Sequence, residues 1–132
     1  MTMLKTPAVP AFKSRVFLWG VDMNPTAIRA RWEGSRFIGI ARAAGYLTRG
    51  VGLPADAFGP EIWGIVVETG IEQRGMPVAL TLPDGTSATA MLAGEPGSLG
   101  TPAEMLAEAH YWELPQAYRD RIQAFIDTGA TP

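Results

Sequence analysis

Residues 15–25 read RVFLWGVDMNP, and they are the part of the sequence that is most informative about the fold. The apolar run at residues 15–20 predicts a strand that is buried on both faces. Asn24 and Pro25 predict a helix start, because an asparagine side chain can cap a free backbone N–H and proline fits the first helical position. We expect this helix to end near Gly34, since glycine tolerates the left-handed closing residue. The stretch therefore predicts a buried strand that leads directly into a helix.

Four further strands are predicted downstream, at residues 36–48, 61–68, 78–82 and 87–92. In the first of them, the small residues Ala43-Ala44-Gly45 indicate a kink or bulge. Residues 49–60 are rich in glycine and proline and are expected to form a loop. The sequence Pro83-Asp84-Gly85 is typical of a hairpin turn between the last two strands.

Two helices are predicted at the C-terminal end. Thr101 and Glu104 match a capping box, in which each side chain bonds the backbone N–H of the other residue, so a helix should run from there to about Tyr111. Pro115 opens a second helix, and Gly129 is its expected end. Leu114, Tyr118, Ile122 and Phe125 share one apolar stripe that should face the sheet. The order of strand, helix, four strands and helix pair indicates an α+β fold.

Composition narrows the range of functions. The 132 residues suit one domain, and we expect a flexible N-terminal arm at 1–14 and the domain at 15–128. The net charge is −2 and no basic cluster appears, so nucleic acid is not an expected partner. There is no cysteine, which excludes disulfides and thiol catalysis, and no apolar run is long enough to span a membrane. We expect a cytoplasmic protein.

Four segments, in order, resemble the γ-glutamylcyclotransferase-like superfamily. They are WGVDMNP at 19–25, GSRFIGIARAAGY at 34–46, IWGIVV at 62–67 and AHYWELPQAY at 109–118. The first is similar to the family's Tyr-Gly-Ser-Asn loop, and the last to its closing helices around Leu-Pro-x-x-Tyr. The resemblance implies a small, mostly antiparallel β-barrel or curled sheet with peripheral helices.

The resemblance also implies a chemistry that uses neither a metal nor a cofactor. In the family, the free amine of a γ-glutamyl group attacks its own γ-carbonyl, which gives 5-oxoproline and a released amine. Backbone N–H groups of a loop hold the substrate and the oxyanion, and a carboxylate takes the proton. The matching substrate-binding loop here is Trp19, Gly20, Val21, Asp22 and Met23.

Two features depart from the family. Asp22 places a negative charge in the loop, and like charges about 4 Å apart cost roughly 4 kcal/mol at an effective dielectric constant near 20, which disfavours a substrate carboxylate there. Asp22 as a second helix cap is an equal alternative. The helix that carries the family's basic glutamate is missing after the strand at 61–68. Glu72 and Glu68 are the candidate bases, although a solvated loop residue and a structural strand residue are the alternatives.

The shortened form is also similar to the C-terminal domain of allophanate hydrolase. We therefore consider two hypotheses for the function. The protein is either a cyclotransferase-like enzyme that acts on a small amide- or amine-bearing substrate, or a non-catalytic binding or assembly module of the same fold. The expected partner is a small-molecule substrate or ligand, and a homodimer is the assembly that we consider.

Overall fold

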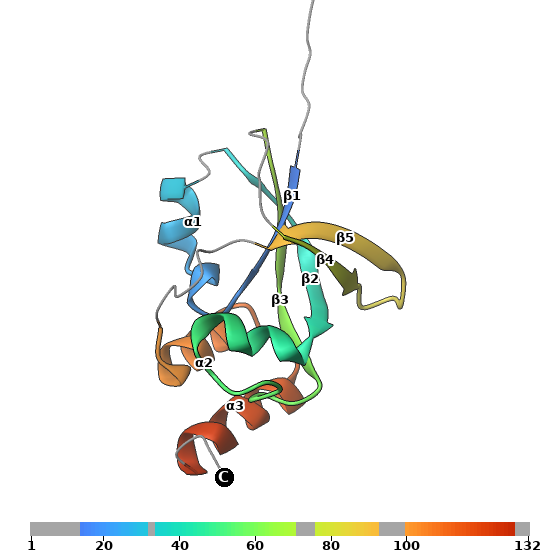
Figure 1. Cartoon of the computed structure of the whole chain (residues 1–132). Coiled ribbons are helices and arrows are strands. Elements are labelled where there is room, and N and C mark those ends of the chain that lie inside the picture. Colours follow the sequence, from blue (N-terminus) through green and yellow to red (C-terminus); the bar gives the residue numbers. More distant parts are fainter. Residues whose placement is uncertain (1–13, 32–33, 71–75, 93–99, 129–132) are drawn as a thin grey trace, which may run out of the picture.

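The computed structural model describes residues 14–31, 34–70, 76–92 and 100–128 (Figure 1). In these ranges the chain follows the predicted order of strand, helix, four strands and helix pair, with two added 3-10 turns. The elements are β1 (Ser14–Trp19), η2 (Gly20–Met23), α1 (Pro25–Arg31), β2 (Arg36–Ala44), η3 (Gly45–Val51), β3 (Glu61–Thr69), β4 (Pro77–Thr81), β5 (Ser87–Leu92), α2 (Pro102–Tyr111) and α3 (Gln116–Thr128).

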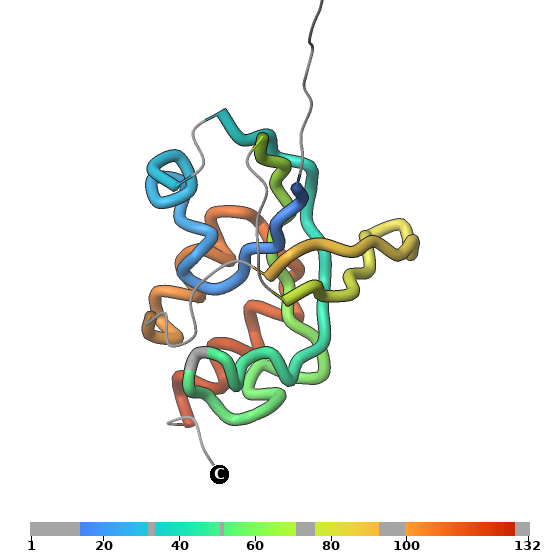
Figure 2. Tube along the Cα trace, turned by 45° about the horizontal axis from the view of Figure 1, so that its top comes forward, coloured from blue at the N-terminus to red at the C-terminus, as the bar shows by residue number. Residues whose placement is uncertain are grey.

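The strands form a closed barrel in the order β1-β3-β2-β4-β5, which confirms the predicted α+β barrel. All neighbouring pairs are antiparallel except β1 and β5, which are parallel and close the barrel. β3 lies between β1 and β2 and pairs with both along most of its length. The β4–β5 hairpin extends to one side of the barrel in both views (Figures 1 and 2).

Glycine allows the close approach of β1 and β3. Gly64 pairs with Trp19, and a Cβ built on Gly64 would lie 2.1 Å from the carbonyl oxygen of Leu18. Any side chain at this position would therefore push the two strands apart.

The prediction that β2 runs to Thr48 with a kink at residues 43–45 is wrong. β2 ends at Ala44, and its bulge lies between Phe37 and Gly39. The chain turns at Gly45 because its N–H donates to the Pro60 carbonyl at 2.9 Å, and its Cα lies so close to Gly59 that a Cβ would be 2.1 Å from the Gly59 oxygen. These contacts with a distant segment stop the strand.

The predicted helix starts are confirmed. The Asn24 side chain accepts hydrogen bonds from the N–H groups of Thr26 and Ala27, at 3.0 and 3.1 Å. Thr101 and Glu104 form the complete capping box. Both helices therefore begin where a local side chain satisfies the free N–H groups of the first turn.

The hairpin turn is confirmed as well. The Gly85 N–H donates to the Leu82 carbonyl at 2.8 Å, and φ of Gly85 is 89°. Asp84 Oδ1 accepts from both the N–H and the hydroxyl of Thr86, at 2.9 and 2.6 Å, and these bonds hold the pKa of Asp84 below its ordinary value.

The core joins the barrel to the C-terminal helices. The predicted apolar stripe of Leu114, Tyr118, Ile122 and Phe125 is buried. Phe58, from the connection between η3 and β3, meets the Phe125 ring edge-on at a centroid distance of 5.4 Å. No helix within the described ranges is long and apolar enough to cross a membrane.

Candidate functional site

The candidate site is the turn η2 at the end of β1. Gly20 has φ of 65°, in the left-handed region that favours glycine, and it turns the chain out of the strand. The strand therefore ends at Trp19, one residue earlier than the predicted boundary at Gly20. The first N–H groups of a helical turn have no partner within it, and Trp19 supplies no side-chain cap to η2. Such N–H groups suit an anion or an oxyanion.

Helix α2 holds this turn in place. The Met105 side chain lies against Gly20, 3.5 Å from where a Cβ would be. The Trp112 indole donates to the Met23 carbonyl at 2.8 Å. Gly100, just before α2, lies so close to the Val21 side chain that a Cβ at Gly100 would clash with it. The turn is thus supported on one side along its whole length.

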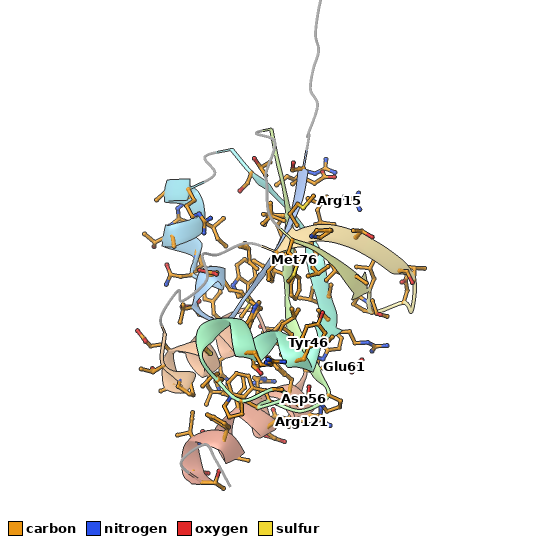
Figure 3. The ribbon with its side chains drawn as sticks, in the orientation of Figure 1. Arg15, Tyr46, Asp56, Glu61, Met76 and Arg121 are labelled. Atoms are coloured by element: carbon orange, nitrogen blue, oxygen red, sulfur yellow. The ribbon has the colours of Figure 1, made fainter. Side chains whose placement is uncertain are left out.

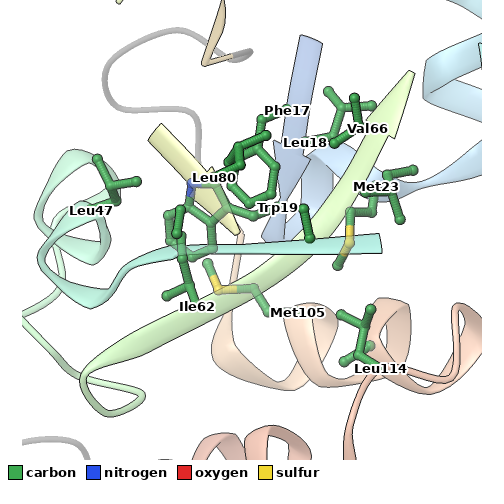
Figure 4. Packing of buried hydrophobic residues seen from close by; sticks show 14 of the residues in the cluster. Phe17, Leu18, Trp19, Met23, Leu47, Ile62, Val66, Leu80, Met105 and Leu114 are labelled. Atoms are coloured by element: carbon green, nitrogen blue, oxygen red, sulfur yellow. The ribbon is translucent and has the colours of Figure 1, made fainter. Parts of the chain in front are cut away.

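This support determines which of the predicted substrate-binding residues reach the surface. The side chains of Trp19 and Met23 are 5% and 1% exposed and belong to the core (Figure 4). Val21 and Asp22 are partly exposed. We therefore assign Trp19 and Met23 to the support of the turn, and contact between Val21, Asp22 and a ligand stays a prediction.

The second capping role considered for Asp22 stays a prediction, beside the cap that Asn24 supplies. Asn24 caps α1 through its side-chain oxygen, as described above. Asp22 lies in the first turn of η2, where a negative charge suits the positive end of the turn.

Glu68 lies at the opposite end of β1 from the turn. Trp19 pairs with Gly64 whereas Arg15 pairs with Glu68, and the four residue steps from Arg15 to Trp19 span roughly 13 Å of strand. The Glu68 carboxylate bonds Arg15 Nε at 3.0 Å and Arg36 Nη2 at 3.3 Å. Figure 3 shows Arg15 at the end of the barrel where β1 begins. This placement favours the structural alternative for Glu68.

The other candidate base, Glu72, lies outside the described residues.

The structure brings a different carboxylate to the turn. Glu108 of α2 is partly buried, and its Oε2 accepts a hydrogen bond from the Asn24 side-chain amide at 3.1 Å. Sequence reasoning missed this residue. A signal was present: Met105, Glu108, Ala109 and Trp112 follow the helical spacing of one face, and three of these four are apolar. A carboxylate on an otherwise apolar helix face is a candidate for a specific contact.

Among solved structures, this chain is similar to one titled gamma-glutamyl cyclotransferase. The TM-score is 0.56 at 17% sequence identity, over 84% of this chain and 86% of that one. It is also similar to an uncharacterized protein from Homo sapiens, with a TM-score of 0.53 at 16% identity, again over 84% of this chain and 86% of that one. No protein-family model matches the sequence, and no curated protein matches it. The chain therefore has the γ-glutamylcyclotransferase-like fold, as predicted.

Proposed function

We propose that this protein acts on a small substrate that carries an amine and an amide, by intramolecular cyclisation or related acid–base chemistry. The observation that supports the proposal is the turn η2 itself. It follows β1 through a left-handed Gly20, begins without a side-chain cap from Trp19, and is supported on one side by α2. Rigid N–H donors of this kind stabilise a developing oxyanion.

The experiment assays two compounds with purified protein. γ-Glutamylalanine would give 5-oxoproline, and 4-aminobutanamide, which lacks the carboxylate beside the amine, would give 2-pyrrolidinone. We expect the second to react faster, because Asp22 disfavours a carboxylate at the turn. No product from either compound at high protein concentration would exclude cyclisation.

A matched pair of glycine variants tests the site. Gly20→Ala and Gly85→Ala both place a side chain at a positive φ, 65° and 89°, so they impose a similar backbone strain. Gly20 lies in η2, whereas Gly85 lies in the hairpin turn, with nothing within 4 Å of its added Cβ. We expect only the Gly20 variant to lose activity. Equal loss in both would indicate general destabilisation.

The alternative is that this fold serves as a non-catalytic module, which binds a small molecule or assembles with another protein. The observation that favours it is the position of Glu68, which is paired with two arginines away from the turn. Binding of either compound to the wild-type protein without turnover would support this alternative.

A further inference from the structure

We infer that Glu108 is the carboxylate that receives the amino group of the substrate at η2 and takes its proton. This inference rests on the proposed function and names the residue and the ligand chemistry of that site. It starts from the face of α2 formed by Met105, Glu108, Ala109 and Trp112. Met105 and Trp112 contact Gly20 and Met23 directly, and Glu108 lies between them on the helix and bonds Asn24. Glu108 therefore faces the turn.

The residues on this face of α2 differ in burial, and therefore in role. Met105 and Ala109 are buried, so they form the packed part of the contact. Glu108 and Asn24 are both partly exposed, as are Val21 and Asp22 of the turn. The carboxylate is thus partly exposed beside the partly exposed residues of the turn.

Charge decides which group Glu108 attracts. Its partner Asn24 is a neutral amide, so this hydrogen bond leaves the negative charge uncompensated. Asp22 and Glu108 are the charged residues of η2 and of the α2 face, and both are acidic. A partly desolvated carboxylate favours an ammonium group, and charge-assisted hydrogen bonds are among the strongest in proteins. The ligand class is therefore a short primary amine whose chain also carries an amide carbonyl.

The reaction balances with Glu108 as the only acid–base group. Glu108 takes one proton from the ammonium, and the amine nitrogen attacks the amide carbonyl, forming the new C–N bond and an oxyanion. Glu108 returns that proton to the leaving nitrogen as the old C–N bond breaks. It then takes a second proton from the new lactam nitrogen and passes it to the departing amine. With 4-aminobutanamide the products are 2-pyrrolidinone and ammonium.

The test uses Glu108→Gln in the full chain. Glutamine keeps a side-chain oxygen that can accept from Asn24, so a purely structural role survives while the charge is removed. Glu113→Gln, an exposed residue just beyond α2, makes the same chemical change away from the turn. We expect kcat for 2-pyrrolidinone formation to fall about 10²- to 10⁴-fold in Glu108→Gln and to stay unchanged in Glu113→Gln. Activity of Glu108→Gln within threefold of wild type overturns the inference and leaves the proposed function intact.

If the wild-type protein forms no product, a second measurement tests amine binding by Glu108 separately from cyclisation. n-Butylamine carries the ammonium but no carbonyl, and its binding is followed by NMR titration. Glu108→Gln should weaken it by about tenfold to a hundredfold, the size of one charged hydrogen bond. That result without turnover refutes cyclisation but keeps Glu108 as the amine-binding group. Equal binding by wild type and Glu108→Gln overturns the inference.

Discussion

Truncation of Phe125 to alanine tests how the C-terminal helices are attached to the barrel. Phe125 is 7% exposed, and its ring packs edge-on against Phe58 at 5.4 Å with an interplanar angle of 88°. Phe58 is fully buried and is also met by Tyr118 at 6.3 Å, so it has little freedom to fill the space that the lost ring leaves. The variant should therefore leave a cavity.

The expected loss of stability follows from that cavity. Phe-to-alanine changes in a core lower the free energy of unfolding by about 3–5 kcal/mol, and the lost edge-on pair accounts for about 0.5–1.5 kcal/mol of it. For a chain of this length, roughly 4 °C of melting temperature corresponds to 1 kcal/mol, so the midpoint should fall by about 12–20 °C. Circular dichroism melts and urea titrations measure both quantities.

The control is Gln123→Ala, on the exposed side of α3, which should change the free energy of unfolding by no more than about 0.5 kcal/mol. Phe58→Leu, alone and combined with the Phe125 change, completes a double-mutant cycle, whose coupling should be about 0.5–3 kcal/mol for side chains in contact. A Phe125→Ala midpoint within about 2 °C of wild type would refute the packing of α3 described here.

Three further predictions concern the barrel, the turn and the buried tyrosine. Gly64→Ala should lower the free energy of unfolding by at least about 3 kcal/mol, because its Cβ would lie 2.1 Å from the Leu18 carbonyl oxygen. The control Gly39→Ala, whose Cβ meets nothing within 4 Å, should melt near the wild-type temperature. Equal melting temperatures of the two variants would contradict the close approach of β1 and β3. Asp22→Asn should bind 5-oxoproline more tightly than wild type in a calorimetric titration, since it removes a negative charge from the turn, and equal affinity would mean that residue 22 does not face the ligand. Burial raises the pKa of the Tyr118 phenol above its ordinary value of 10.0, so the folded state resists its ionisation. This contribution to stability is complete below pH 10 and declines as the pH rises above it, because the unfolded state then loses its proton first. Tyr118→Phe should therefore show a weaker loss of stability in urea titrations at increasing alkaline pH, and the same pH dependence as wild type would count against a buried phenol.

Features whose bonding partners lie within a few residues were predictable from the local sequence. Asn24 caps α1 through N–H groups two and three residues away, Thr101 and Glu104 cap α2, and the turn at Gly85 closes within four residues. Such bonds depend on local backbone geometry alone, so residue type and spacing were sufficient. The strand at residues 61–68 was recognised from its apolar run, and the apolar stripe of α3 from its helical period.

Which distant side chains meet depends on the packing of the whole chain. Asn24 and Glu108 are 84 residues apart, and Glu68 meets Arg15 across 53 residues because β1 and β3 pair in one particular register. A shift of one residue would turn each side chain to the other face, and no local signal specifies such a register. The end of β2 at Ala44 likewise depends on the approach of Gly59 and Pro60 to Gly45. The candidate site was therefore predictable as a turn, but its carboxylate was not, since that residue is set by how α2 packs against η2.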